Sequence, residues 1–154
     1  MLRFKKILCP TDFSDPSHEG LKLANEIASG VPAEIFLVHV LEPIPPAPVP
    51  EFHAAAAFDV GGYDKELEVA AKKHLLELVD KHISKETKTH TIVARGNASA
   101  EIVRVAEEEK LDLIVISTHG RTGWRRLVFG SVAEKVVRLA PIPVLTVPQP
   151  EQEG

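Results

Sequence analysis

The chain has 154 residues, 44% of them hydrophobic and 26% charged, and its formal net charge is -4 at pH 7. This length fits one domain, residues 1–154, which buries roughly two thirds of its unfolded surface on folding. The slight acidity argues against a generally basic face for nucleic acid or an anionic membrane, and no apolar run reaches the roughly 20 residues of a membrane helix.

The single cysteine, Cys9, has no partner for an internal disulfide and rules out a multi-cysteine metal site. Residues 1–10 contain no hydrophobic signal segment. We therefore expect a cytoplasmic protein with no membrane and no nucleic-acid partner.

The first half of the chain alternates apolar runs with amphipathic segments, which is typical of strands and helices around a parallel sheet. The pattern predicts a strand over Ile7–Cys9, a helix from Ser14 or Asp15 to Gly30, and a strand over Glu34–Val40. Five prolines follow between positions 43 and 50, and two glycines lie at 61 and 62. Residues 41–62 are therefore interpreted as a flexible connector rich in Pro, Ala and Gly; a lid or partner-docking segment is the alternative.

The second half continues the same alternation. The predicted elements are a helix from about Tyr63 to Ile83, a strand over Thr89–Val93, a helix carrying Ile102, Val103 and Ala106, a strand over Leu111–Ile116, a helix opened by Ser131, and a strand over Val144–Val147. Polar and apolar residues alternate in Thr89–Val93 more than in the other strands, which favours an edge position.

Five strands and four helices in this order predict an α/β fold with a five-stranded parallel sheet and helices on both faces. Right-handed crossovers and the semi-polar third strand at an edge are both satisfied by the strand order 3-2-1-4-5. In this Rossmann-like arrangement a crevice opens beyond the carboxyl ends of the first and fourth strands. The segments Pro10–Ser17 and Ser117–Gly130 face each other there.

The segment after the fourth strand is rich in glycine. Gly120, Gly123 and Gly130 allow backbone amides to approach a ligand, and Ser131 opens a helix whose N–H groups favour an anion such as phosphate. His119 at the end of the strand adds a side chain that can contact phosphate. Ser131 and Glu134 also fit a capping box that serves stability alone. A local basic cluster lies in the same loop: Arg121, Arg125 and Arg126.

Several standard motifs are absent from the sequence. It has no Walker motif, no Gly-x-Gly-x-x-Gly after the first strand, and no Gly-x-Ser-x-Gly, which argues against the corresponding hydrolases and dehydrogenases. His39 is as readily a hydrogen-bonded structural residue as a ligand contact. The remaining histidines lack metal-ligand spacing, so we expect no protein metal cluster and interpret them as lying on solvated faces: His18, His53, His74, His82 and His90.

Three pieces of the chain together resemble the universal stress protein family. They are Pro10-Thr11-Asp12-Phe13-Ser14 after the first strand, Val38-His39-Val40 at the end of the second, and Gly120 followed after nine residues by Gly130-Ser131. The likeness runs from Lys5 to Val147. The family's ATP-binding branch is described by Gly-x-x-Gly, nine residues and Gly-Ser/Thr, and Ser117 stands here in place of the first glycine.

This resemblance implies an adenine nucleotide alpha hydrolase-like version of the fold and an ATP site in the crevice. Asp12 and Val40 would border the adenine, and Pro10, Thr11 and Ser117 the ribose. The phosphates would be held by Gly120, Gly130, Ser131 and Val132. The resemblance also allows Mg2+ on the triphosphate and implies a homodimer through the last strand, Val144, Leu145, Thr146 and Val147, whose edge position invites pairing.

The resulting hypothesis is a nucleotide-dependent signalling or protective module of the stress response. The sequence contains no placed base, arginine finger or Walker-type metal ligand, so we assign no catalytic residue and expect slow ATP hydrolysis at most. Two alternatives stay open. One is a stress protein that binds no nucleotide and acts through protein-protein contacts, and the other is a weak ATPase that uses Asp12 or His119.

Overall fold

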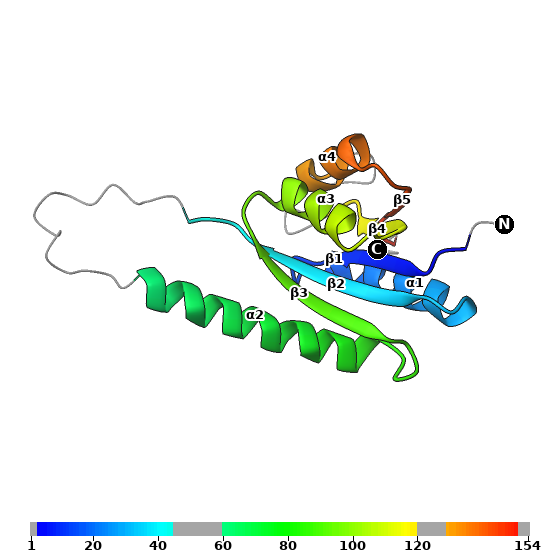
Figure 1. The fold of residues 1–154 in the computed structure, drawn as a ribbon, viewed down its shortest axis with the longest axis horizontal. Coiled ribbons are helices and arrows are strands. Elements are labelled where there is room, and N and C mark those ends of the chain that lie inside the picture. Colours follow the sequence, from blue (N-terminus) through cyan, green and yellow to red (C-terminus); the bar gives the residue numbers. More distant parts are fainter. Residues whose placement is uncertain (1–2, 45–59, 120–128, 151–154) are drawn as a thin grey trace, which may run out of the picture.

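The computed structural model describes residues 3–44, 60–119 and 129–150. Its five strands form one parallel sheet in the order β3-β2-β1-β4-β5 (Figure 1), which confirms the predicted strand order and the α/β fold class. The strands are β1 (Lys6–Pro10), β2 (Glu34–Leu41), β3 (Thr89–Arg95), β4 (Leu113–Ser117) and β5 (Val144–Val147). The helices are α1 (Asp15–Gly30), α2 (Val60–His82), α3 (Ala98–Glu108) and α4 (Ser131–Leu139).

The two faces of the sheet are covered by different helix pairs because successive strand residues point to opposite sides. Ile7 and Leu37 pack against α1 and α2, whereas Leu8, Phe36 and Val38 pack against α3 and α4. Figure 1 shows α3 and α4 on one side of the strands and α2 on the other. The central strands are therefore apolar along their length, as a sheet covered on both faces requires.

The strand β3 lies at one edge, as its mixed polarity predicted, and most of its residues are half-buried. The strand β5 forms the other edge of the described sheet, where it pairs with β4 from Ile114↔Val144 to Ser117↔Val147. No helix in residues 3–44, 60–119 and 129–150 has the length and apolar character that crossing a membrane requires.

Several element bounds differ from the sequence prediction. The strands β1 and β3 are longer than predicted because their pairing with β2 continues from Lys6↔Glu34 to Pro10↔Val38 and up to Leu41↔Arg95. Strand β4 begins at Leu113 rather than Leu111, because its pairing with β1 starts at Ile7↔Leu113, while the Leu111 N–H still donates to the Ala106 carbonyl of α3 at 2.9 Å.

The predicted connector is shorter than residues 41–62. Leu41 belongs to β2, and α2 already begins at Val60, so the helix includes Gly61 and Gly62; residues 45–59 lie outside the described residues. Arg95 at the end of β3 stabilises this early start, because its guanidinium donates to the Asp64 carbonyl at 2.8 Å and to the Glu68 carboxylate at 3.2 Å. These contacts offset the low helix propensity of the two glycines.

Candidate functional site

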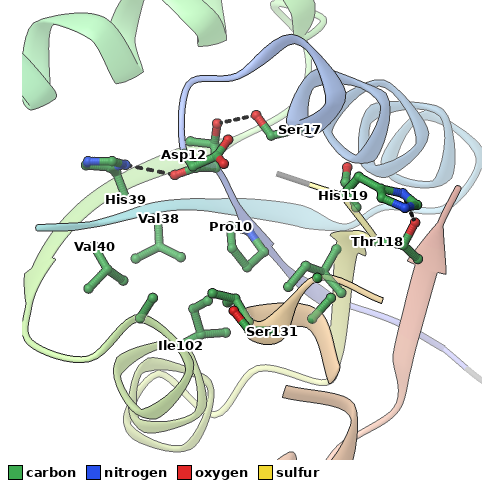
Figure 2. A pocket seen from close by; sticks show the side chains of 17 residues that line it. Pro10, Asp12, Ser17, Val38, His39, Val40, Ile102, Thr118, His119 and Ser131 are labelled. Carbon is green, nitrogen blue, oxygen red and sulfur yellow. Dashed lines mark hydrogen bonds between the residues drawn. The ribbon is translucent and has the colours of Figure 1, made fainter. Parts of the chain in front are cut away.

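A pocket of about 210 Å³ lies at the carboxyl ends of β2, β1 and β4 (Figure 2), at the crevice that the topology predicted. This volume is below the roughly 300–1,000 Å³ of typical small-molecule sites, so the described residues enclose part of a ligand of that size. The lining residues are Pro10, Thr11, Asp12, Ser17, Val38, His39, Val40, Ala98, Ile102, Ile116, Ser117, Thr118, His119, Gly130, Ser131, Val132 and Ala133.

One wall of the pocket is apolar. Val38 and Val40 extend from the same side of β2 toward α3, whereas His39 projects from the opposite side of that strand (Figure 2). Ile102 of α3 and Ile116 of β4 complete this wall, and both side chains belong to the core between the sheet and α3 and α4. Such a wall suits the face of a flat, weakly polar ring.

The hydroxyl groups of Thr11 and Ser17 form hydrogen bonds within the segment that joins β1 to α1. The Phe13 N–H donates to Thr11 Oγ1 at 3.1 Å, Thr11 Oγ1 and Ser17 Oγ are 2.9 Å apart, and the Ser17 hydroxyl donates to the Ser14 carbonyl at 2.7 Å. Because Ser17 gives its one hydrogen to that carbonyl, Thr11 is the donor to Ser17. Both hydroxyl hydrogens are therefore used within the loop.

Asp12 holds the same loop through its carboxylate. Its Oδ1 accepts the Ser14 N–H at 3.0 Å and also the Ser14 hydroxyl. This is the turn-forming role that an Asp at this position commonly has. Since Asp12 also lines the pocket, its position is set by the loop before any ligand arrives.

A stack of three rings, those of Phe13, His39 and His74, holds the same loop in place. The His39 Nδ1 lies 2.8 Å from the Thr11 carbonyl oxygen, so this nitrogen carries the hydrogen and donates it. The ring of Phe13 stacks on His39 and on His74 of α2, each with 4.1 Å between ring centroids. Phe13 has φ 65°, a left-handed conformation that costs free energy for a bulky residue and persists only where its surroundings hold it. His39 is thus a hydrogen-bonded residue that positions the pocket loop.

Ser117 at the end of β4 faces α1. Its Oγ accepts the Gly20 N–H at 3.2 Å, and a Cβ at Gly20 would lie 2.9 Å from that oxygen. The serine that replaces the expected glycine therefore has its own complementary glycine on the neighbouring helix.

The ends of β4 and β5 and the start of α4 are joined at Thr118. Its N–H donates to the Val147 carbonyl at 3.0 Å, its carbonyl accepts the Gly130 N–H at 2.7 Å, and its hydroxyl lies 2.9 Å from His119 Nδ1. A Cβ at Gly130 would lie 3.1 Å from the same carbonyl oxygen, so a glycine allows this close approach.

Among the described residues, no side chain caps the N-terminus of α4. Gly130 is the N-cap residue and Ser131 is the first helical residue, so the predicted capping box between Ser131 and Glu134 is wrong. The carboxylate of Glu134 pairs with Arg138 instead. Residues 131–133 line the pocket, and their N–H groups have no intrahelical acceptor because they belong to the first turn.

The neighbouring helix α3 shows the opposite arrangement. Its N-cap Asn97 accepts the Ala100 N–H at 3.2 Å, and the Glu42 carboxylate accepts the Ala98 N–H at 3.3 Å. Two side chains thus satisfy the start of α3, whereas within the described residues the start of α4 faces the pocket without such a cap. An anion with several acceptor oxygens fits the start of α4.

Nine of the ten residues predicted from the sequence line this pocket, while Gly120 lies outside the described residues together with Gly123, Trp124 and the three loop arginines. Sequence reasoning missed the rest of the lining. Val38 could have been predicted, because alternation along β2 places it on the same face as Val40. Ala98 and Ile102 could not, because they reach the pocket only through the tertiary placement of α3. The other missed residues are Ser17, Ile116, Thr118 and Ala133.

Three histidines outside the pocket are half-buried rather than fully solvated as predicted: His18, His82 and His90. The rings of His18 and His82 are 5.0 Å apart, and the Nε2 atom of each is buried with no hydrogen-bond partner in the described part of the chain. Burial, followed by the charge of His18, lowers the pKa of His82. His90 stacks on Phe36, and its Nε2 lies 2.8 Å from the Glu34 carboxylate.

His74 is exposed but stacks on Phe13, and His53 lies outside the described residues. Among residues 3–44, 60–119 and 129–150, no group of three or more His, Cys, Asp and Glu side chains could hold a metal ion.

Comparison with known proteins assigns nearly the whole chain to one family. The family model described as the universal stress protein family matches residues 3–148. Universal stress protein MJ0531 of Methanocaldococcus jannaschii is 37% identical over 151 residues, which cover 97% of this chain and 85% of that protein. Universal stress protein MJ0577 of the same organism is 32% identical over 155 residues, which cover 94% of each chain.

Solved structures show the same fold. The structure of MJ0577 has a TM-score of 0.81 at 28% identity and covers 98% of this chain and 100% of its own. A universal stress protein in complex with cAMP has a TM-score of 0.63 at 19% identity, and one from Archaeoglobus fulgidus in complex with dAMP has 0.54 at 21% identity. Each of these two covers 95% of this chain and 98% of its own. At these two identities the likeness concerns the fold alone.

Proposed function

The chain belongs to the universal stress protein family, and we propose that it binds ATP in the crevice between β1 and β4 as a nucleotide-dependent module of the stress response. One observation carries the proposal. A single pocket has an apolar wall at the end of β2 and, beyond β4, a helix N-terminus that no described side chain caps. Adenine suits the first and phosphate the second.

The roles that the resemblance implies agree with the positions of the described residues. Val40 at the end of β2 and Asp12 after β1 would border the adenine, and Pro10, Thr11 and Ser117, at the ends of β1 and β4, line the same pocket and would contact the ribose. The phosphates would be held by Gly130, Ser131, Val132 and His119, with Gly120 entering by the resemblance alone.

The fit to phosphate is supported by Gly130. Its missing side chain allows the loop to approach Thr118 closely, and the first-turn amides of α4 then lie along the pocket. The Ser131 hydroxyl is exposed, and no hydrogen-bond partner is found for it among the described residues. Donors without protein acceptors match the acceptor oxygens of a phosphate.

Mg2+ would accompany the triphosphate. Because the described residues contain no group of three metal-binding side chains, the ion would be held by phosphate oxygens and water, as is common for magnesium at nucleotides. Its role would be to neutralise phosphate charge, while the chain's own residues orient the nucleotide.

The two relatives of this fold that are complexes with cAMP and dAMP make an adenine nucleotide a natural first ligand to test. Their identities to this chain support the fold only, so the proposal depends on the pocket residues. A cytoplasmic location remains part of the proposal on the sequence argument.

The test is calorimetric titration of nucleotide-free protein with ATP, AMP and cAMP, each with and without Mg2+. We expect saturable binding of ATP. Absence of binding at millimolar ATP would refute the proposal and favour the alternative in which the protein acts through protein-protein contacts. Single-turnover product analysis addresses the weak ATPase, and we expect product to form slowly or not at all because no arginine finger or placed base is evident.

We also propose a homodimer formed through β5. Among the described strands, residues 144–147 pair only with β4, which leaves the outer backbone groups of an edge strand available. Leu145 is 38% exposed there, and Leu139 of the adjacent helix is 57% exposed. In solution we expect the scattering mass of two chains for the wild type and of one chain for Leu145→Glu, since a two-fold axis brings the two new charges together. A single-chain mass for the wild type would refute the dimer.

A further inference from the structure

Gly20 and Ser117 form a matched pair between α1 and β4. Gly20 lies in the interior of α1, where glycine is among the least favourable residues. A Cβ there would come within 2.9 Å of Ser117 Oγ and 3.4 Å of the Ser117 nitrogen. A glycine at position 20 therefore leaves room for the Ser117 hydroxyl, which a larger residue would displace.

The Ser117 hydroxyl has a hydrogen left to donate. Its oxygen accepts the Gly20 N–H at 3.2 Å, and no acceptor for its own hydrogen is found among the described residues. The nearby hydroxyls differ, because Thr11 donates to Ser17 and Ser17 donates to the Ser14 carbonyl. The Thr118 hydroxyl donates to the Val147 carbonyl at 3.5 Å and also lies 2.9 Å from the His119 ring nitrogen. Among the described hydroxyl groups that line the pocket, Ser117 and Ser131 each have a hydrogen for which no acceptor is found, and Ser131 lies at the start of α4, at the proposed phosphate end.

The position of Ser117 selects the part of the ligand that it can reach. The apolar wall begins at the end of β2, the uncapped helix follows β4, and Ser117 is the last residue of β4. Adjacent strands are about 4.8 Å apart, so two strand spacings, about 10 Å, separate the end of β2 from Ser117. In a nucleotide the sugar occupies the space between base and phosphates.

We propose that Ser117 determines sugar specificity: its hydroxyl, oriented by the Gly20 N–H, donates a hydrogen bond to a hydroxyl oxygen of the ribose. This inference depends on the proposed nucleotide function and adds the preference of the site for a ribonucleotide. The Gly20 N–H holds the serine oxygen, which directs the remaining donor away from α1.

The experiment is a calorimetric cycle of two proteins and two ligands. Wild type and Ser117→Ala are titrated with ATP and with 2′,3′-dideoxy-ATP, with thermal unfolding as a check of the fold. We expect Ser117→Ala to weaken ATP binding about two- to tenfold, the range for one hydrogen bond, and to leave dideoxy-ATP binding unchanged. Titration with 2′-deoxy-ATP and 3′-deoxy-ATP then identifies the sugar oxygen that Ser117 contacts. The variant and the wild type should bind equally the ligand that lacks this oxygen, whereas the variant should bind the other ligand more weakly.

A second variant displaces the hydroxyl without removing it. Gly20→Ala forces Ser117 Oγ to move, so we expect the same selective loss for ATP. Ser29→Ala is the matched control, because it removes another α1 hydroxyl, one that donates to the Asn25 carbonyl at 2.8 Å on the exposed side. Its ATP affinity should equal that of wild type.

The outcomes separate the two proposals. If wild type binds neither ATP nor dideoxy-ATP, the nucleotide function fails and the sugar preference fails with it. If wild type binds ATP but Ser117→Ala binds it equally well, only the sugar preference is overturned. An equal loss for ATP and dideoxy-ATP also overturns it and assigns Ser117 to packing or to a phosphate contact.

Discussion

Replacing Gly130 by valine tests the phosphate end of the pocket. Gly130 has φ -56° and ψ 152°, an extended conformation open to any residue, so the substitution introduces no backbone strain. A Cβ meets the Thr118 carbonyl oxygen at 3.1 Å, and this oxygen also accepts the Gly130 N–H at 2.7 Å. The branched side chain therefore separates the start of α4 from Thr118 and blocks the approach of an anion to the first-turn amides.

The two expected effects differ in size. Losing the hydrogen bond to Thr118 costs about 0.5–1.5 kcal/mol, and the stiffer unfolded chain offsets part of this. For a domain of this length the melting temperature should fall by about 5 °C at most. Losing one hydrogen bond to a charged phosphate costs about 1.5–3 kcal/mol, so ATP affinity should fall about ten- to a hundredfold.

Titration calorimetry measures the affinity, and thermal unfolding measures the stability of the same samples. Gly30→Ala is the control, because nothing lies within 4 Å of a Cβ at Gly30 and alanine is the better helix residue. It should retain wild-type affinity and gain slightly in stability. Unchanged ATP affinity in Gly130→Val, with the fold retained, would refute the assignment of the phosphate end.

Three further predictions concern the core and the histidines. Burial, then the positive charges of His18, Lys81 and Lys22, lowers the pKa of His82 below its ordinary 6.5. The unfolded chain therefore binds more protons there, and the free energy of unfolding should decrease as the pH falls below about 6.5. Urea unfolding at pH 7.5 and 5.5 should show a smaller decrease for His82→Phe; an equal decrease would contradict this role. His74→Ala removes one ring stacked on Phe13 at 4.1 Å and should cost about 0.5–1.5 kcal/mol in urea unfolding, whereas an unchanged midpoint would mean that the stack does not stabilise the fold. Burial raises the pKa of the Cys9 thiol to about 12, so a thiol reagent at pH 8 should label Cys9 only as the chain unfolds; rapid labelling of the native protein would disprove its burial.

Local patterns were sufficient where they encode burial. Uniformly apolar runs predicted the covered strands, and the mixed polarity of Thr89–Val93 placed β3 at an edge. They were insufficient where neighbouring residues compete for one role. Gly130 and Ser131 are both acceptable N-cap residues, and the hydrogen bond from Gly130 to the Thr118 carbonyl accompanies the choice of Gly130.

The expectation of solvated histidines was wrong for His18 and His82, for a related reason. A helix pattern identifies a polar residue but not the element that will cover it. His18 and His82 lie on different helices, and their contact exists only because α1 and α2 share one face of the sheet.

By itself the sequence determined the alternation of strands and helices, the strand order and the location of a crevice, because side-chain periodicity and crossover handedness act on short segments and on their sequence order. Tertiary structure alone decided which polar atoms meet. The contact of Ser117 with Gly20 joins residues 97 positions apart, and the stack on Phe13 joins a loop, a strand and a helix. Such partners depend on distances of a few ångströms between packed elements, and no periodicity along the chain carries that information.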